Sequence, residues 1–418
     1  RARYGIIVSM DTSRFIPIEA RSALSRATLP DPFFACLYRC LAPYRGCAHG
    51  CRYCDGRAEK YYVEGDFERD VAARTNLPDL VARDVAAGFG SREWGAVGIG
   101  SGVTDVYQPL ERELGLTRRA LEELVPAGLP VVILTKSDLI LRDFDILARF
   151  PRALVLVTVT TVDPEKARVL EPGAASPANR LEVVKRARAA GFMTGVMAMP
   201  LCPGITMEEE STERLFAACL ESGAEFIEAG GVTLRPGRQK EFFLDEVVRS
   251  HYPDLEPLYA SLFRENRQSG MPLSGESFKS ACALRARLDA LKVSSNIPHS
   301  AYRELLSAPD ALFVLFCHMQ GLYDARGVDT KPLRAATDRY AAWLSESRAE
   351  LRRKRAKVVA SDPFPITRVL SSMLLDLSAN GGSALATLIG NERLARLASE
   401  LIEKNGTFDY TTLSLRLS

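Results

Sequence analysis

Short apolar runs alternate with longer amphipathic stretches between residues 67 and 232. The runs are rich in Val and Ile and apolar at nearly every position, which is typical of strands buried on both faces of a parallel sheet. They span 94–100, 130–135, 153–160, 193–200 and 225–232. With a first strand expected at 34–39, they make six strand–helix units. The pattern therefore predicts an α/β fold, a partial (β/α)6 barrel of the TIM type.

The pattern changes near residue 240, where helical periodicity continues and the strand signal fades. We therefore expect a mainly helical C-terminal extension, with a further boundary near residue 325. The predicted organisation is an N-terminal arm at 1–34, the partial barrel at 35–240, a helical extension packed on the barrel at 241–325 and a C-terminal helical region at 326–418.

The bulk composition is that of an ordinary globular protein. The chain has 418 residues, of which 47% are hydrophobic and 25% charged, and its formal net charge is +2. No apolar stretch approaches the roughly 18 residues that span a bilayer, and no signal-peptide pattern opens the chain. We expect a cytoplasmic protein with no membrane partner. Composition alone gives no argument for nucleic acid.

Nine cysteines are unevenly placed along the chain. An odd number with a dense cluster is a poor disulfide framework, and clustered cysteines in a long intracellular chain more often bind metal or do redox chemistry. Three of them, Cys47, Cys51 and Cys54, lie in the stretch "APYRGCAHGCRYCDGR" at 42–57. Upstream, Cys36 and Cys40 are too few for a second cluster, and we expect strand or core positions for them.

The cysteine loop allows three interpretations. In the first, the thiols are coincidental core residues, which a loop dense in Gly, Arg and His disfavours. In the second, His49 or an upstream cysteine completes a structural zinc site, although zinc fingers usually bring two separated pairs of ligands and no second pair follows at suitable spacing. In the third, three cysteines bind an iron–sulfur cluster and leave its fourth iron open. Gly46 and Gly50 permit the backbone turns that such a loop needs.

The spacing of the cysteines resembles that of the radical S-adenosylmethionine (SAM) enzymes. Three residues separate Cys47 from Cys51, two separate Cys51 from Cys54, and the aromatic Tyr53 precedes the last cysteine. The wider string "YRGCAHGCRYC" is similar to that of the spore photoproduct lyase-like branch, often labelled DNA repair photolyases. Further stretches agree in the same order, at 102–111, 134–147, 170–181 and 200–205. The resemblance covers about residues 35–235.

The resemblance implies a [4Fe–4S] cluster on Cys47, Cys51 and Cys54, with S-adenosyl-L-methionine on the open iron. One electron, from a donor such as a flavodoxin or ferredoxin, would cleave the cofactor to a 5′-deoxyadenosyl radical that takes hydrogen from a substrate. The substrate is unidentified, and the family points to damaged DNA. Two alternatives stay open: radical modification of a peptide or small metabolite, and a non-catalytic zinc or iron–sulfur binding protein.

The resemblance also implies cofactor-binding residues after two of the strands. At the end of the second strand, Gly100, Ser101 and Gly102 would meet the amino group of the cofactor, unless the glycines only make a tight turn. At the end of the fourth strand, Thr158 and Thr160 would offer hydroxyls to the ribose, unless they are simply strand formers.

Two further side chains are expected beside the cofactor. Tyr53 would lie against the adenine side through its backbone. Arg180 would meet the cofactor carboxylate, and a surface arginine is the alternative for it.

Candidate catalytic residues follow predicted strands at their carboxyl ends, the face on which barrel enzymes gather their chemistry. Asp105, Tyr107 and Lys136 lie there, and loop salt bridges are the alternative for the charged ones. The spore photoproduct lyase carries a hydrogen-donating cysteine after its second strand, where this chain has Gly102. The reaction of the lyase itself is therefore in doubt, and Cys202, just beyond the fifth strand, is the other candidate radical partner.

The strongest basic run is "RAELRRKRAK" at 348–357. On a helix its charges spread over several faces and glutamates dilute them, so we expect a solvated face. Contact with phosphate, which would make binding steeply salt-dependent, is the alternative.

Overall fold

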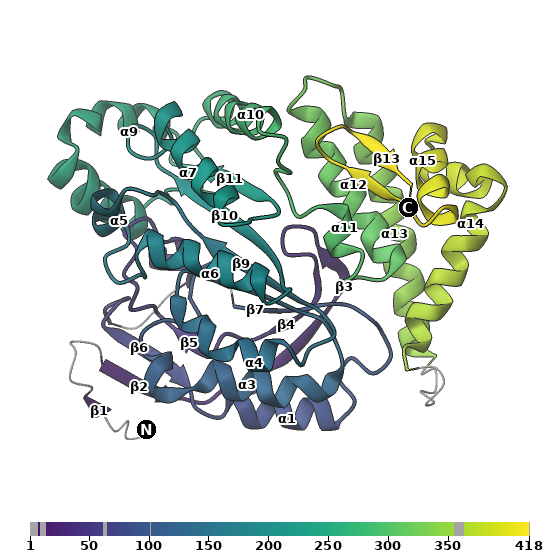
Figure 1. The fold of residues 1–418 in the computed structure, drawn as a ribbon, viewed down its shortest axis with the longest axis horizontal. Helices are drawn as coiled ribbons and strands as arrows, with labels where there is room; N and C mark the ends of the chain where they lie inside the picture. The colour runs from purple at the N-terminus through teal and green to yellow at the C-terminus, as the bar shows by residue number, and fades with distance from the viewer. Residues whose placement is uncertain (1–6, 9–13, 62–64, 101, 355–362, 418) are drawn as a thin grey trace.

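A seven-stranded sheet forms the centre of the computed structural model, which describes residues 7–8, 14–61, 65–100, 102–354 and 363–417 (Figure 1). Its strand order is β11-β10-β9-β8-β7-β4-β3. The strands are β3 (Leu24–Asp31), β4 (Cys36–Cys40), β7 (Val97–Ile99), β8 (Val131–Thr135), β9 (Ala153–Thr158), β10 (Met193–Leu201) and β11 (Ile227–Gly231). From β4 to β11 every neighbouring pair is parallel. The six predicted strands and the partial barrel are confirmed.

Helices on the outside of the sheet connect the parallel strands (Figure 1). They are α1 (Leu77–Ala86), α2 (Glu111–Leu114), α3 (Leu116–Leu124), α4 (Phe144–Leu147), α5 (Pro164–Leu170), α6 (Pro177–Ala189) and α7 (Glu209–Glu221), with short helical turns at Asp55–Arg57, Glu59–Tyr61, Val125–Ala127 and Asp138–Asp143. The start of α6 follows local rules: Pro177 occupies the first helical position, and the Ser176 hydroxyl accepts a hydrogen bond from the Asn179 backbone N–H at 3.2 Å. All of β9 is buried, as its unbroken apolar run predicts.

The segment predicted as an N-terminal arm contributes strands to two sheets. β3 pairs antiparallel with β4 at the edge of the large sheet. A smaller sheet has the order β1-β2-β6-β5 and comprises β1 (Ile7–Val8), β2 (Arg14–Ile18), β5 (Tyr44–Arg45) and β6 (Asp70–Arg74). Half of β3 is exposed, and its sequence lacks the continuous apolar run by which the other strands are recognised. β5 leads directly into the cysteine loop.

The C-terminal part is mainly helical, and its helices from residue 299 onward lie beside the β3 edge of the sheet (Figure 1). After β11 the chain forms α8 (Arg238–Phe243), a π-helix (Leu244–Arg249), a 3₁₀ turn (Pro253–Leu255), α9 (Glu256–Leu262), α10 (Ser274–Ala290), α11 (His299–Tyr302), α12 (Ala308–Asp324), α13 (Lys331–Arg353), α14 (Pro365–Ile389) and α15 (Glu392–Glu403). A hairpin of β12 (Thr407–Asp409) and β13 (Ser414–Arg416), absent from the predicted helical pattern, follows. None of the described helices is both long and apolar enough to cross a membrane.

Ion pairs attach α13 to α12 and to the segment before β7. Arg348 is 1% exposed, and its guanidinium donates to both carboxylate oxygens of Asp310 at 2.6 and 2.7 Å. Arg352 pairs with Glu93 at 2.6 Å. The predicted solvated face is therefore wrong for these two arginines, because their partners lie far away in the sequence. Residues 355–357 of the basic run lie outside the described residues.

A buried histidine joins the C-terminal hairpin to the barrel. The Nε2–H of His318 donates to the carbonyl oxygen of Pro32 at 2.9 Å, so its Nδ1 accepts from the Tyr410 hydroxyl at 2.8 Å. A second buried histidine, His299, accepts from the backbone N–H of Phe408 through Nδ1 at 3.1 Å. Burial lowers the pKa of each of these histidines to about 4.

These two histidines predict a loss of stability in acid. Each has a lower pKa in the folded chain than the value of about 6.5 expected when unfolded, so the unfolded state takes up more protons below that pH. The free energy of unfolding should therefore be highest above about pH 6.5 and fall as the pH approaches 4. Urea unfolding at a series of pH values measures this. His318→Gln should flatten the fall, whereas the exposed control His251→Gln should not, and equal slopes for both variants would contradict the assignment.

Candidate active site

The cysteine loop turns tightly between β5 and the helical turn Asp55–Arg57. Its backbone closes on itself, because the Gly50 N–H donates to the Cys47 carbonyl at 3.2 Å and the Cys54 N–H donates to the Cys51 carbonyl at 3.3 Å. Gly46 and Gly50 have φ of 80° and 63°, the left-handed region in which glycine is favoured. The predicted role of these two glycines in the turns is confirmed.

The three cysteines line one cavity together with the carboxyl ends of β8 and β9. The other lining residues are His49, Gly102, Val103, Thr104, Asp105, Leu134, Thr135, Lys136 and Thr158. Four residues predicted from the sequence, Gly102, Asp105, Lys136 and Thr158, are thus brought together with the cysteines. They lie at or just after the ends of three successive strands, β7, β8 and β9, as expected for the carboxyl edge of a parallel sheet.

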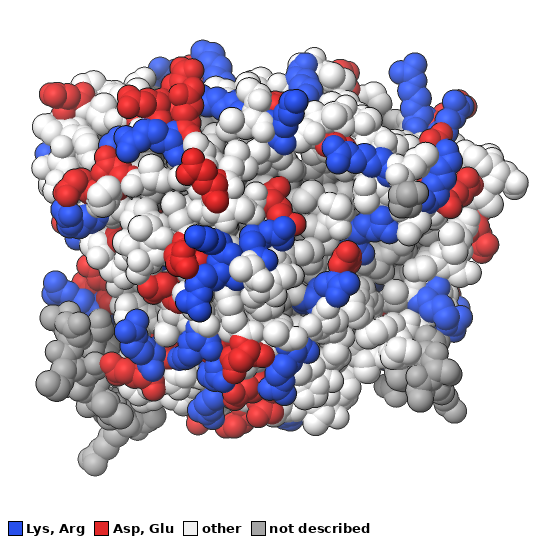
Figure 2. All heavy atoms as spheres, viewed as in Figure 1, with Lys and Arg blue, Asp and Glu red and all other residues white. Residues whose placement is uncertain are grey.

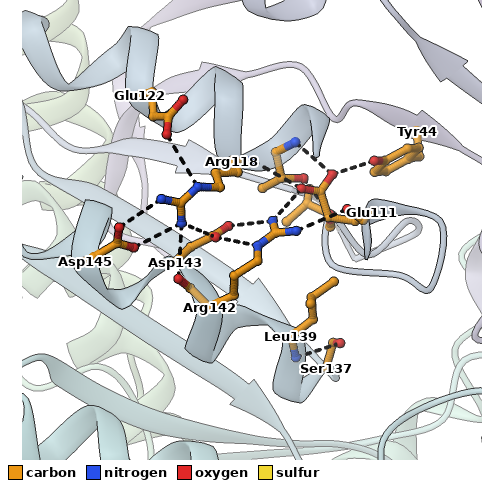
Figure 3. A network of polar contacts seen from close by, with 11 residues as sticks. Tyr44, Glu111, Arg118, Glu122, Ser137, Leu139, Arg142, Asp143 and Asp145 are labelled. Atoms are coloured by element: carbon orange, nitrogen blue, oxygen red, sulfur yellow. Dashed lines mark hydrogen bonds and ion pairs between the residues drawn. The ribbon is translucent and has the colours of Figure 1, made fainter. Parts of the chain in front are cut away.

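One side of the loop is held by the segment that follows β7. The Gln108 side chain donates to the Gly46 carbonyl at 3.2 Å and accepts from the Ala48 backbone N–H at 2.9 Å. The Tyr44 hydroxyl, at the start of the loop, donates to the carboxylate of Glu111 (Figure 3). Glu111 and Gln108 are both fully buried, so each contact is made away from water.

Glu111 belongs to a network of charges that Figure 3 shows from close by. Arg142 pairs with Glu111 at 2.8 Å and with Asp143 at 2.7 Å. Arg118 pairs with the same Asp143 at 2.9 Å and with the exposed Asp145 at 2.9 Å. The two fully buried carboxylates, Glu111 and Asp143, are therefore compensated by two half-buried guanidinium groups.

The opposite side of the loop is held by Glu171, which follows α5. Its carboxylate accepts hydrogen bonds from the Tyr53 hydroxyl, from the Thr160 hydroxyl at 3.0 Å and from Arg180 at 2.5 Å. The second guanidinium nitrogen of Arg180 donates to the carbonyl of Thr158 at 3.0 Å. Arg180 is 1% exposed and so is not a surface residue. Burial alone would raise the pKa of Glu171, but Arg180 and Lys136 outweigh it and hold that pKa below its usual value.

The backbone after Glu171 lies directly against the loop. The Gly173 N–H donates to the His49 carbonyl at 2.9 Å, and the Arg52 N–H donates to the Leu170 carbonyl at 2.8 Å. A Cβ atom on Gly173 would lie only 2.4 Å from the carbonyl oxygen of Ala48. Glycine is therefore required here by close approach of two backbones.

Two buried side chains satisfy the carbonyl groups of the loop itself. Arg57 donates to the Cys51 carbonyl at 3.0 Å and to the Gly50 carbonyl at 3.0 Å. Gln239, at the start of α8, donates to the Tyr53 carbonyl at 2.8 Å. Sequence reasoning missed Glu171 and Gln239 because the contact that ties each of them to the loop is with Tyr53, which lies more than a hundred residues away along the chain.

Asp105 joins the loop after β7 to the end of β8. Its carboxylate accepts from the backbone N–H of Tyr107 at 2.8 Å, from the Thr135 hydroxyl at 2.8 Å and from the backbone N–H of Lys136 at 2.6 Å. His49 Nδ1 lies 3.5 Å away from it. Through these contacts the Asp105 carboxylate holds the loop after β7 against the end of β8, and so it shapes the cavity wall.

Lys136 is the cation of the cavity. Its Nζ lies 5.9 Å from the centre of the Tyr53 ring. Burial would lower its pKa, but the carboxylates of Glu171 and Asp105 act against that effect, and the pKa is raised. Lys136 therefore keeps its charge at the cavity wall.

The remaining predicted residues lie outside this cavity. Cys202 is fully buried in an apolar cluster that also contains Cys51 and Tyr53, and burial strongly raises the pKa of its thiol. Tyr107 is fully buried in the main core. Gly100 ends β7 in a left-handed conformation, with φ of 95°. Ser101 lies outside the described residues.

The three cysteine thiols line one cavity, but they do not meet at a single point as the ligands of one metal ion do. Within the described part of the chain, no three His, Cys, Asp or Glu side chains are grouped closely enough to hold one metal ion. Burial raises the pKa of all three thiols, that of Cys51 to about 12. Without a metal the thiols are therefore protonated, and metal binding would release their protons.

This chain is similar in sequence to known proteins. A family model described as the radical SAM superfamily matches residues 41–216. An uncharacterized protein of Mycobacterium tuberculosis is 30% identical over 272 residues, which are 63% of this chain and 78% of the relative. A radical SAM Nalpha-GlyT isomerase of Pseudomonas phage M6 is 23% identical over 244 residues, 57% of this chain and 48% of the isomerase.

Solved structures of spore photoproduct lyase share the fold. One variant of that lyase superposes with a TM-score of 0.50 at 13% sequence identity, covering 66% of this chain and 79% of the lyase. A structure described as the lyase complexed with dinucleoside spore photoproduct gives a TM-score of 0.50 at 12% identity.

Removing the negative charge of Glu171 should greatly lower the free energy of unfolding. Glu171→Gln keeps the size of the side chain but leaves the buried guanidinium of Arg180 without a counter-charge, which should lower the free energy of unfolding by about 3 kcal/mol. Urea unfolding measures this. Glu165→Gln, which breaks an exposed pair with Arg168, is the matched control and should change nothing measurable. Equal stability of the two variants would show that the contacts of Glu171 do not hold the loop.

Proposed function

The chain belongs to the radical SAM superfamily and is an enzyme, and we propose that Cys47, Cys51 and Cys54 hold a [4Fe–4S] cluster on which it uses S-adenosyl-L-methionine. The observation that carries the proposal is the position of three thiols, at the superfamily's spacing, in one cavity beside the ends of β8 and β9. When bound, the cluster and S-adenosyl-L-methionine would supply a one-electron cleavage of the sulfonium bond. That cleavage gives a carbon radical, which removes a hydrogen atom from a substrate.

The residues present fit such a cluster better than a zinc ion. In a cluster each cysteine binds a different iron, so the three sulfurs need not meet at one point as they must around a zinc ion, and no three described His, Cys, Asp or Glu side chains meet in that way. The Gly56 N–H donates to the Cys54 sulfur at 3.4 Å, a contact of the kind that tunes cluster sulfurs. Apart from the chain neighbours of Gly102, no described residue lies within 4 Å of the point where its Cβ would be, which leaves room beside the cysteines.

The cavity residues divide into two roles under this proposal. Gly102, Thr158 and the cation Lys136 line the cavity and would bind the polar groups of the cofactor, with Lys136 opposite its carboxylate. Thr160 and Arg180 are committed to Glu171 and act as positioning residues. The electron would come from a flavodoxin- or ferredoxin-like donor.

A nucleic acid is the substrate class that we propose first. Its support is the printed description of a structurally similar lyase that binds dinucleoside spore photoproduct. The face of the molecule in Figure 2 carries interspersed basic and acidic side chains rather than a broad basic surface. In its described part, this face therefore offers no broad basic surface to a phosphate backbone, and a peptide or small metabolite is the alternative that the test distinguishes.

Loss of one cluster cysteine should abolish cluster formation. After anaerobic reconstitution with iron and sulfide, the wild-type chain should hold about four irons, and Cys47→Ala should lose the cluster absorbance. Cys219→Ala, in a buried thiol of α7, is the control and should keep both. Unchanged iron content in Cys47→Ala, or one zinc per wild-type chain, would refute the cluster.

The reconstituted protein should release 5′-deoxyadenosine only when reductant and S-adenosyl-L-methionine are both present. Under the nucleic-acid proposal, an ultraviolet-irradiated oligonucleotide should increase that release, measured by chromatography, and a peptide mixture should not. Stimulation by peptides alone would favour the alternative substrate class. No 5′-deoxyadenosine under any condition would overturn the proposed activity.

A further inference from the structure

A second and much larger cavity, of about 710 Å³, adjoins the cysteine cavity. It lies between the β3–β4 edge of the large sheet and the strands β5 and β6 of the small one. Three residues of the loop after β7, Gly102, Val103 and Thr104, line both cavities. A molecule in the larger cavity would thus touch the same loop as a ligand beside the cysteines.

Phe67 is the wall between the larger cavity and the cysteines. Its ring lines the larger cavity and packs in an apolar cluster with Cys47 and Cys54. A Cβ on Gly56, another lining residue, would lie 2.7 Å from the same ring, so the wall is closely packed. The larger cavity therefore ends one side chain away from two of the three thiols.

The charges around the larger cavity are of one sign among the described residues. Arg39, Arg45, Lys60 and Arg74 line it, and no described Asp or Glu does. Arg39 is paired, because it forms an ion pair with Asp31. Arg74 donates to the carbonyls of Ala42 and Tyr44 at 2.7 and 3.1 Å, which fixes its guanidinium without neutralising it.

Arg45 stands next to Tyr44 in the chain and close to Arg74 in space. Burial, and after it the charge of Arg45, lowers the pKa of Arg74. Two neighbouring cations that repel each other are stabilised when an anion binds between them. Lys60 adds a third positive charge at the cavity, and its Nζ lies 5.2 Å from the centre of the Tyr61 ring.

We propose that this larger cavity binds the substrate, and that Arg45, Lys60 and Arg74 recognise an anionic group on it, a phosphate or a carboxylate. Four aromatic residues, Phe34, Tyr44, Tyr61 and Phe67, line the same cavity and offer apolar surface to a flat or apolar part of the substrate. The role as a substrate site rests on the proposed function. The anion site itself rests on the positive charges around the cavity and does not depend on the proposed function.

Titration of the reconstituted protein with inorganic phosphate and with succinate, at constant ionic strength, tests the proposal. Calorimetry or thermal shift should detect binding of at least one probe. Arg45→Gln and Lys60→Gln should each weaken that binding by about tenfold, because each removes a hydrogen bond to a charged group. Arg119→Gln, in an exposed arginine of α3, is the matched control and should bind as the wild type does.

Every outcome of this titration either supports or overturns the proposal. Binding of phosphate alone assigns a phosphate-bearing substrate, binding of succinate alone assigns a carboxylate, and binding of both supports the anion site. Binding of neither probe, or equal binding by all three variants, overturns the proposal. Binding is measured without reductant, so a protein that binds an anion but releases no 5′-deoxyadenosine refutes the proposed function and leaves the anion site intact.

Discussion

Two buried carboxylates hold the cysteine loop from opposite sides, and the geometry of the site depends on them. Glu111 receives the hydroxyl of Tyr44 before the first cysteine, and Glu171 receives the hydroxyl of Tyr53 before the last. A carboxylate buried without partners would be strongly disfavoured, so each must keep its full set of donors. The loop is thereby fixed in one conformation by the requirement that these charges stay compensated.

The same requirement explains why separate stretches of the chain meet at one point. The segment 102–111 contributes Gln108 and Glu111, and 134–147 contributes Lys136 and Arg142. The segment 170–181 contributes the carboxylate of Glu171 and its counter-charge. These are the stretches that resemble the spore photoproduct lyase-like branch, so the resemblance describes the support of the loop as well as the loop itself.

Much of the fold could be predicted because its strands are buried on both faces. Such a strand is apolar at nearly every position, and β8 and β9 could be recognised from that alone. β3 escaped prediction because the polar Ser25, Arg26 and Thr28 on its exposed half leave it without an apolar run. The basic run of α13 was misjudged because Arg348 is buried by partners that adjoin it only in space.

Gly173 extends the definition of the cysteine motif beyond the cysteines. Its missing side chain makes room for the carbonyl of Ala48, so a glycine far along the chain is as much a part of the loop as Gly46 or Gly50. A sequence search that requires the three cysteines alone accepts chains in which this contact is sterically forbidden. One that also requires a glycine two positions after the loop-binding glutamate selects for the backbone packing that this site needs.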